Sequence, residues 1–317
     1  MKKYKLGRME KSLKYWLKYS IRYILAKVIG DKMLLYKYVT PERIDIIENL
    51  MIRYTQPEAL NDPLEGKVVF DQFASEAEME KTFQENFVNE LKNQYELLPQ
   101  DIKKHITLKG FVKYVDKEKP DAYNEFKSLL EAVTPDIKTS MKCAFDGRVG
   151  VLSLTETPNN MSMWAHYAMN HRGFVLGFDA EHPYFHQKRS ESDEFYYLRR
   201  VKYYEQKDRI LKKMLELSMD DIFLAKNIEW SYESEWRILA PVQYADCKND
   251  SVSPVVYLFK FPPEALRQII IGENMDIRNR EKILHIIRSK SEMHHIELKQ
   301  AKINVEQFHL DIVDYLY

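Results

Sequence analysis

Two carboxylates one residue apart are the strongest chemical candidates in the sequence. Glu233 and Glu235 lie in the segment 229–240, which also contains four residues able to pack or pair with them: Trp230, Tyr232, Trp236 and Arg237. In a β-strand, alternation places Glu233, Glu235 and Arg237 on one face. Because an unpaired buried charge is costly, the two carboxylates must meet cations, hydrogen-bond donors, a metal ion or water. The pair therefore predicts a functional site, with a structural ladder of ion pairs as the alternative.

An earlier segment places a histidine near a predicted tight turn between a helix and a strand. Residues 161–179 have the pattern of a short helix, a tight turn and a strand, and Gly173 follows the helical pattern where a left-handed cap is expected. His166 on this helix titrates near neutrality, so it could act as an acid, a base or a phosphate donor. We expect its neighbours Trp164 and Tyr167 to pack in the core.

A polar turn adds two more carboxylates. Asp62 and Glu65 lie in the stretch 60–66, where an Asn-Asp-Pro sequence and a glycine indicate a turn. Together with Glu233 and Glu235 they would offer Mg²⁺ the oxygen ligands it prefers, and His166 would serve as base or phosphate donor. This set predicts a metal-dependent nuclease or phosphodiesterase. The alternative is an Asx turn that ties the loop.

Strands and helices alternate irregularly along the chain. The hydrophobic pattern predicts strands at 33–38, 52–55, 149–155, 201–204, 229–240, 255–261 and 268–271, one or two edge strands in 296–313, and helices at 41–51, 208–227 and 278–290. Without a repeating strand-helix period, the order favours an α+β fold with a mixed or antiparallel sheet core over a doubly wound one.

Residues 72–145 differ in composition from the rest. They are rich in helix formers of mixed charge, they show no strand pattern, and Pro99, Pro120 and Pro135 separate the helical stretches. We predict an insertion of three or four helices that covers the core. Residues 31–317 then form one α+β domain with this insertion.

The first thirty residues read as a basic amphipathic helix. Apolar residues recur with helical spacing from Leu13 to Val28, and residues 1–32 contain ten Lys or Arg against two acidic residues. Such a helix suits a protein, a nucleic acid or an anionic membrane surface. The alternative is that its apolar stripe packs on the body of the chain.

The composition as a whole excludes several classes. The 48 basic and 48 acidic residues balance, so overall charge does not argue for a nucleic-acid partner. Cys143 and Cys247 have neither metal nor redox spacing, and no stretch reaches the roughly 18 apolar residues of a membrane span. No phosphate loop, nucleophile elbow or CxxC pair occurs. These features predict a cytoplasmic protein without a transmembrane segment.

Five separated motifs resemble the bacterial domain of unknown function family 2971. They are Leu35–Tyr38, Leu60–Gly66, Leu152–Glu156, Met163–Phe174 and Trp230–Arg237, and the resemblance extends from about 33 to 275. The basic N-terminal helix lies outside it, and Leu64 stands where an aromatic residue is expected. The resemblance implies a bacterial, cytosolic protein but no particular reaction.

A second similarity carries more chemistry. The order of a basic or tyrosine-bearing first strand, a middle Ser-x-Thr strand and a late Glu-x-Glu strand looks like the layout of ADP-ribosyltransferases, in which these three strands line an NAD cleft. The resemblance implies that Tyr36 or Arg53 holds the dinucleotide and that Ser153 and Thr155 brace the site. In this layout Glu235 stabilises the charge that develops on the ribose, and Glu233 orients the acceptor.

The sequence therefore supports three candidate functions. The first is an NAD-dependent, ADP-ribosyltransferase-like bacterial effector, such as a toxin or phage-defence protein, acting on a macromolecular acceptor. The second is the Mg²⁺-dependent nuclease or phosphodiesterase, and the third a non-enzymatic interaction module. NAD should raise the melting temperature only in the first case, Mg²⁺ or Mn²⁺ mainly in the second, and neither in the third.

Overall fold

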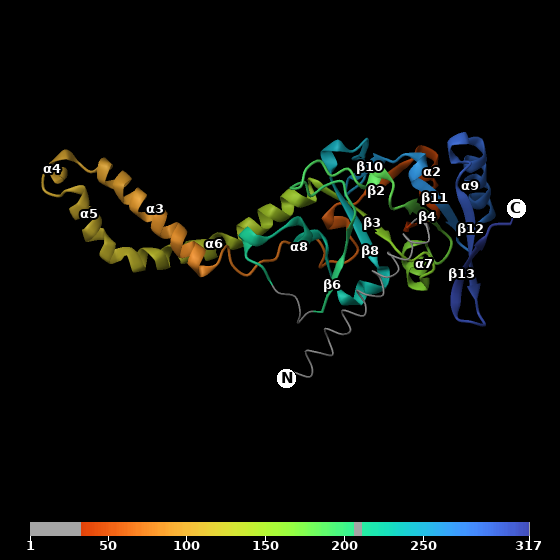
Figure 1. Cartoon of the computed structure of the whole chain (residues 1–317), viewed down its shortest axis with the longest axis horizontal. Coiled ribbons are helices and arrows are strands. Elements are labelled where there is room, and N and C mark those ends of the chain that lie inside the picture. Colours follow the sequence, from red (N-terminus) through yellow and green to blue (C-terminus); the bar gives the residue numbers. More distant parts are fainter. Residues whose placement is uncertain (1–32, 206–210, 317) are drawn as a thin grey trace. The chain divides into compact units, whose positions relative to one another are not determined.

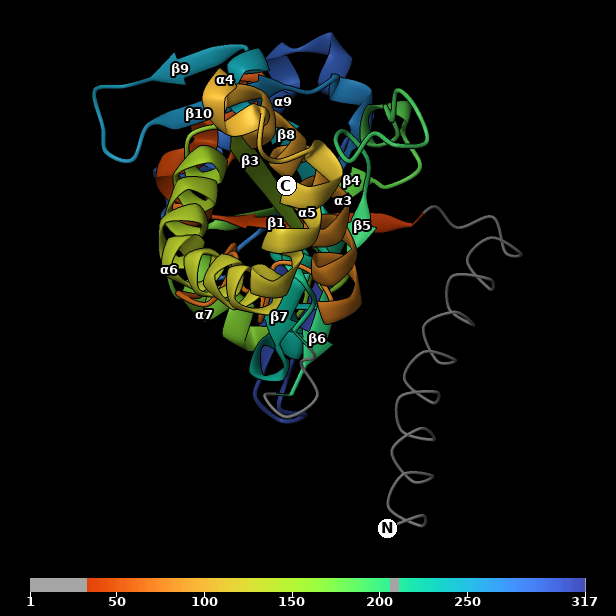
Figure 2. The same ribbon diagram turned by 90° about the vertical axis from the view of Figure 1, so that its left-hand side faces the viewer.

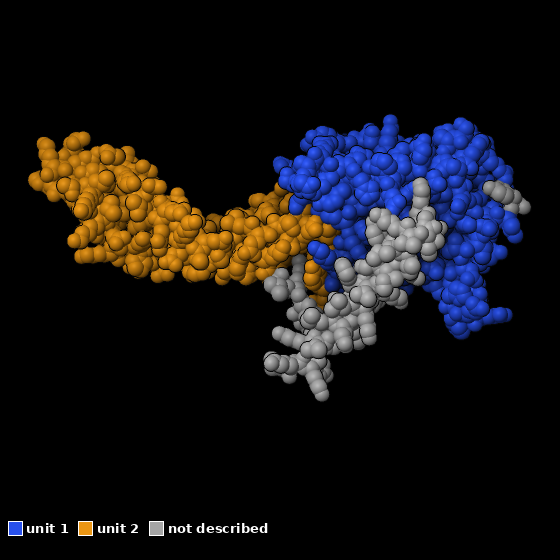
Figure 3. All heavy atoms as spheres, in the orientation of Figure 1, with its two compact units in different colours: residues 1–61, 148–203, 226–317 blue, residues 62–147, 204–225 orange. Residues whose placement is uncertain are grey.

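The computed structural model describes residues 33–205 and 211–316 (Figure 1). The basic helix expected at residues 1–30 lies outside this range. The chain divides into two compact units, coloured separately in Figure 3. Unit 1 comprises residues 1–61, 148–203 and 226–317, and unit 2 comprises residues 62–147 and 204–225.

Unit 1 is built on an eight-stranded sheet of order β13-β12-β11-β4-β1-β3-β8-β5. Its strands are β1 (Leu34–Val39), β3 (Val149–Thr155), β4 (Phe174–Asp179), β5 (Arg199–Arg200), β8 (Glu235–Pro241), β11 (Leu266–Ile271), β12 (Glu297–Asn304) and β13 (His309–Asp314). Only β11 and β12 are parallel, and the other neighbours in this sheet are antiparallel. The predicted α+β class with a mixed sheet is confirmed.

Strand alternation divides the apolar residues of the sheet between two cores. One core contains Leu35, Leu176 and Ile238 with residues from α2 (Asp45–Asn49) and α9 (Ile277–Ser289). The other contains Tyr38, Val175 and Ile270 with Met163 and Trp164 from α7 (Met161–Tyr167). Because successive side chains point to opposite faces, residues 35 and 38 of one strand serve different cores.

Two smaller sheets complete the strands of the described residues. Strands β2 (Met51–Tyr54), β10 (Val256–Lys260) and β9 (Cys247–Asn249) form one, in which β9 and β10 run side by side in Figure 2. Strands β6 (Lys202–Tyr204) and β7 (Ala225–Asn227) form the other. Thr55, directly after β2, bridges to Val151 of β3.

One edge of β3 is shared by two strands that diverge. The β1–β3 register has a single pair, Tyr36 opposite Thr155, whereas β3 pairs with β8 along its whole length. Further along the same edge, Val151 exchanges both backbone hydrogen bonds with Thr55, each 2.8 Å long. Strands β1 and β2 therefore form a fork on β3, and Ser153 lies between the two points of attachment.

The helix, turn and strand predicted for 161–179 are confirmed, but the role expected for Gly173 is wrong. The left-handed residues are Met169, Asn170 and His171, with φ of 47°, 51° and 64°. Gly173 is required for a different reason. A Cβ at this position would lie 2.1 Å from the carbonyl oxygen of Val39 on the neighbouring strand.

Two predicted elements between 208 and 234 are wrong within the described residues. Instead of one helix to Asn227, the chain forms a short α8 (Met219–Phe223), whose Ser218 cap is closed by Asp221, and then enters β7. Residues 228–233 form a 3-10 helix rather than a strand. Asn227 caps that turn by accepting a hydrogen bond from the amide of Glu229, so local capping overrides the alternating pattern.

Unit 2 contains the helical insertion. Its helices between 72 and 147 are α3 (Glu76–Leu97), α4 (Gln100–Lys103), α5 (Leu108–Val115) and α6 (Lys119–Asp146), as predicted in type and approximate number. Helices α3 and α6 pack through an aromatic cluster that includes Phe83, Tyr123 and Phe126. Pro135 does not separate two helices as expected, because α6 continues through it. The role of the insertion as a cover for the core stays a prediction.

No described helix has the length and apolar composition needed to cross a membrane.

Candidate functional site

Glu235 is the first residue of β8 and is held by two cations. The Nε and Nη2 atoms of Arg237 lie 2.7 and 2.9 Å from its two carboxylate oxygens, and Nζ of Lys226 lies 3.0 Å from Oε2. All three side chains are buried. Burial alone would raise the pKa of Glu235, but the charges of Arg237 and Lys226, with hydrogen bonds from Arg237 and Ser153, lower the pKa to about 2. Glu235 is therefore ionised at neutral pH.

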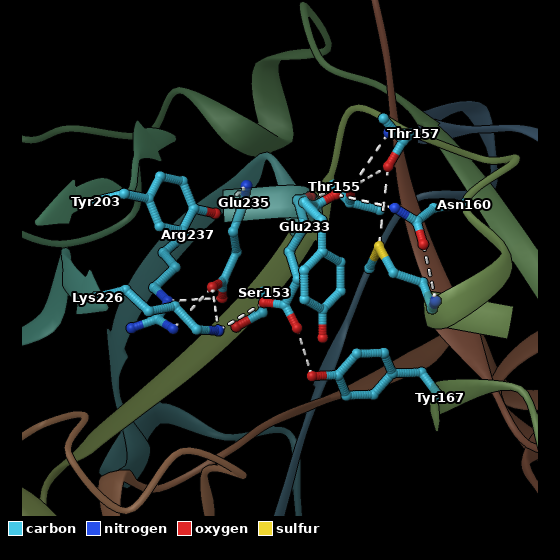
Figure 4. A network of polar contacts seen from close by, with 12 residues as sticks. Ser153, Thr155, Thr157, Asn160, Tyr167, Tyr203, Lys226, Glu233, Glu235 and Arg237 are labelled. Carbon is cyan, nitrogen blue, oxygen red and sulfur yellow. Dashed lines mark hydrogen bonds and ion pairs between the residues drawn. The ribbon is translucent and has the colours of Figure 1, made fainter. Parts of the chain in front are cut away.

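Glu233 shares the same lysine. It ends the 3-10 helix Ile228–Glu233, and its Oε2 lies 2.6 Å from Nζ of Lys226 while its Oε1 accepts a 2.5 Å hydrogen bond from the hydroxyl of Tyr167. Burial raises the pKa of Tyr167, and the hydrogen bond to Glu233 raises it further, so the phenol stays protonated and acts as a donor. Figure 4 shows Lys226 reaching toward both carboxylates. The ammonium group also lies 5.0 Å from the centre of the Trp230 ring.

A turn, rather than a strand, brings the two carboxylates together. Ser234 between them adopts a left-handed conformation with φ of 44°, which a non-glycine residue rarely adopts. The surrounding backbone is anchored on both sides: Thr155 Oγ1 donates to the carbonyl of Glu233, and the amide of Glu235 donates to the hydroxyl of Tyr203 over 2.9 Å. These bonds hold Glu233 and Glu235 in a convergent arrangement.

The site also extends across three neighbouring strands. Tyr36 of β1 lies opposite Thr155 of β3, and Thr155 lies opposite Glu235 of β8. Two residues before Thr155 on β3, Ser153 lies opposite Arg237 of β8. Because directly opposed residues point to the same face of a sheet, these residues of β1, β3 and β8 share one face. Three residues far apart in the sequence, Tyr36, Thr155 and Glu235, thus form one row.

Arg53 lies on β2, outside this sheet, but beside its fork. Counting back from the bridge between Thr55 and Val151 puts Arg53 in register with Ser153 and on the same face. Its Nε atom is buried and has no hydrogen-bond partner. Burial lowers the pKa of Arg53, and the positive charge of Arg43 lowers it further. Arg53 is therefore a guanidinium with unused capacity to bind an anion.

His166 differs from the other predicted catalytic residues. It is exposed on α7, and its ring lies 6.3 Å, centroid to centroid, from that of Tyr167. The residue of this helix that reaches Glu233 is Tyr167, for which the sequence predicts only a packing role. Trp164 does pack, fully buried and stacked at 5.7 Å on His171.

The alternative magnesium set receives little support from the geometry. Asp62 Oδ1 accepts a 2.9 Å hydrogen bond from the amide of Leu64, which is the Asx turn considered as its alternative. Glu233 and Glu235 already bind Lys226 and Arg237. Among residues 33–205 and 211–316, no three His, Cys, Asp or Glu side chains gather in a way that could hold a metal ion.

One family model matches the chain. Residues 163–238 match DUF2971, described as a protein of unknown function. The resemblance expected from the motifs is confirmed for this part of the chain. No curated protein and no solved structure matches the chain.

The DUF2971 match includes most of the polar network. It covers Tyr167, Lys226, Glu233 and Glu235, together with Arg237, whereas the residues contributed by β1, β2 and β3 lie outside it. The network thus lies mostly in the part of the chain that matches the DUF2971 model, and the row with Tyr36 and Thr155 adds neighbouring strands to it.

The sequence did not indicate a role for Lys226, and for Tyr167 it predicted only packing in the core. Lys226 falls near the end of the helix predicted for 208–227, and no motif in the sequence singles it out. Its burial against two carboxylates depends on the pairing of β7 with β6. No local sequence pattern predicts this pairing. The sequence does hold one signal for Lys226. Two carboxylates that are buried near a single arginine require a second cation to compensate their charge.

Proposed function

We propose that the chain is an NAD-consuming, ADP-ribosyltransferase-like bacterial effector that acts in the cytoplasm on a macromolecular acceptor, as a toxin or in phage defence. The observation that carries this proposal is the row of Tyr36, Thr155 and Glu235 across three neighbouring strands. The similarity in sequence concerned only the order of these strands along the chain. Their adjacency as β1, β3 and β8 is independent support for the same layout.

The side chains have properties that suit the reaction. Glu235 remains ionised and fixed, so it can stabilise the positive charge that develops on the ribose as the bond to nicotinamide breaks and its electron pair leaves with nicotinamide. An acceptor nucleophile, oriented by Glu233, then bonds to the ribose carbon and releases its proton. Ser153 braces Glu235, and Thr155 braces the carbonyl of Glu233.

The unpaired guanidinium of Arg53 fits the dinucleotide. A buried Nε donor without a partner matches a phosphate oxygen, and Arg53 lies on the same face as Ser153. Tyr36 is the second residue proposed to hold the dinucleotide, at the β1 end of the row. The ammonium group of Lys226 already bridges the two carboxylates, so a ribose that approaches Glu235 must compete with it.

One observation favours a non-enzymatic interaction module as the second candidate. The two negative charges of Glu233 and Glu235 are matched by those of Lys226 and Arg237 at short distances, as in a buried structural network. Under this alternative, the network would hold the turn at Ser234 in place and the binding surface would lie elsewhere.

The test compares NAD turnover in two matched variants of the full chain. Glu235→Gln should abolish nicotinamide release, measured by chromatography, because a neutral amide cannot stabilise the ribose cation. Glu229→Gln, an exposed residue of the neighbouring 3-10 helix, should retain it. NAD turnover by Glu235→Gln at the wild-type rate would contradict the transferase proposal.

Thermal unfolding separates the three candidates. NAD at about 100 times its Kd should stabilise the wild type by about 2.7 kcal/mol if it binds the native state. Stabilisation by Mg²⁺ or Mn²⁺ in place of NAD would support the nuclease, and no shift with either ligand would support the interaction module.

A further inference from the structure

The hydroxyl of Tyr167 and the carboxylate of Glu233 have the arrangement of a nucleophile and its base. The hydroxyl donates a 2.5 Å hydrogen bond to Oε1 of Glu233, and Nζ of Lys226 holds Oε2 of the same carboxylate at 2.6 Å. Figure 4 shows Tyr167 and Lys226 approaching Glu233 from different sides. Side chains are activated for covalent chemistry when a base lies within hydrogen-bond reach and a third group orients that base. Tyr167, Glu233 and Lys226 meet this description.

Two contacts fix the helix that carries Tyr167 to the turn that carries Glu233. Tyr167 is the last residue of α7, and Asn160 caps the start of this helix by accepting a 3.1 Å hydrogen bond from the amide of Met163. Nδ2 of Asn160 also donates a 3.2 Å hydrogen bond to the carbonyl of Tyr232, the residue before Glu233. The helix is therefore joined to the turn at both of its ends, so the position of the phenol does not depend on a single side-chain rotamer.

Tyr167 is the group through which a ligand reaches Glu233. Lys226, the other side chain that bonds this carboxylate, is buried, as is Glu233 itself, whereas Tyr167 is partly exposed. The charges of Glu233 and Glu235 are already matched by those of Lys226 and Arg237. The network therefore does not need the phenol for charge compensation, and the phenol hydroxyl lies at its accessible side.

We propose that Tyr167 is itself an acceptor of the ADP-ribosyl group, so that the chain modifies its own α7. The inference rests on the proposed function, in which Glu233 orients the hydroxyl or other nucleophile of the acceptor. The hydroxyl of Tyr167 already makes the hydrogen bond to Glu233 that such an acceptor requires. With no other acceptor bound, this phenol is the nucleophile held at the base.

The transfer to Tyr167 balances without a further reactant. The bond between the ribose carbon and nicotinamide breaks, and its electron pair leaves with nicotinamide while Glu235 stabilises the positive charge on the ribose. A lone pair of the phenol oxygen forms the new bond to that carbon, and the phenol proton passes to Oε1 of Glu233. The modified oxygen has no proton left to donate, so each chain accepts one group at this position.

Mass spectrometry of the full chain after incubation with NAD tests the inference. The wild type should gain one ADP-ribosyl group, and fragmentation of its peptides should place the group on Tyr167. Tyr167→Phe should not gain it, because phenylalanine has no nucleophilic oxygen. Tyr232→Phe removes a phenol hydroxyl from the residue next to Glu233 in the sequence and should still gain it. Glu233→Gln removes the base and should slow the incorporation about 100-fold.

The outcomes separate this inference from the proposed function. Nicotinamide release with the ADP-ribosyl group on another residue, or with free ADP-ribose as the sole product, would overturn the modification of Tyr167 and leave the proposed function standing. No nicotinamide release would overturn both. Incorporation by Glu233→Gln at the wild-type rate would overturn the role of Glu233 as the base. If Tyr167→Phe does not fold by circular dichroism, the position of the group in the wild type decides, since that measurement needs no variant.

Discussion

The ammonium group of Lys226 lies 2.6 Å from a carboxylate oxygen of Glu233, and both side chains are about 5% exposed or less. The same nitrogen lies 3.0 Å from Glu235, so one cation joins the two carboxylates through a single point. Arg237 completes the network from the β8 side. Because every member is buried, the removal of one partner leaves the others with charges that water cannot compensate.

We expect Lys226→Met to destabilise the fold strongly. The methionine matches the length of lysine but removes the ammonium group that both Glu233 and Glu235 contact, and breaking a buried pair in this way costs about 3–5 kcal/mol. Urea unfolding should show this loss. Lys212→Met, which breaks a more exposed pair with Asp221, should cost less than about 1 kcal/mol. A loss for Lys226→Met no larger than that of Lys212→Met would contradict the buried-charge argument.

The depressed pKa of Glu235 predicts acid sensitivity. The folded-state pKa is about 2 and the ordinary value is 4.5, so the unfolded chain binds the proton more readily. The stabilisation is present above the unfolded pKa of about 4.5 and is lost as the pH falls toward 2, with a total of about 3 kcal/mol. Unfolding free energies between pH 6 and pH 2.5 should fall more steeply for the wild type than for Glu235→Gln. Parallel curves would show that Glu235 does not titrate as described.

Tyr167 and His166 should respond differently to substitution. Tyr167→Phe removes the hydroxyl that donates to Glu233, and the loss of a hydrogen bond to a charged group costs about 1.5–3 kcal/mol. His166→Ala removes an exposed side chain and should change the unfolding free energy by less than about 0.5 kcal/mol. Nicotinamide release by the His166 variant then tests its predicted catalytic role separately, since its fold should be intact. Equal stability of the two variants would argue against the Tyr167 contact.

Local chemistry determined much of the architecture. Period-two alternation identified β1 and β3, and the sequence of helix, turn and strand at 161–179 was predicted correctly. The helices of the insertion followed from their composition. The pairing of Glu235 with Arg237 was also accessible, because two residues with the same strand parity must share a face.

Only the tertiary structure decided how the site is assembled. Strand alternation says which face a residue occupies but not which strand lies beside it, so the row from Tyr36 through Thr155 to Glu235 required the order of the sheet. The left-handed Ser234 and the capped turn before it replaced a predicted strand, yet they still direct Glu233 toward Lys226. The burial of that lysine depends on contacts made after β7 pairs with β6. A charged residue in isolation favours water, and only the folded chain supplies the two carboxylates that make its burial favourable.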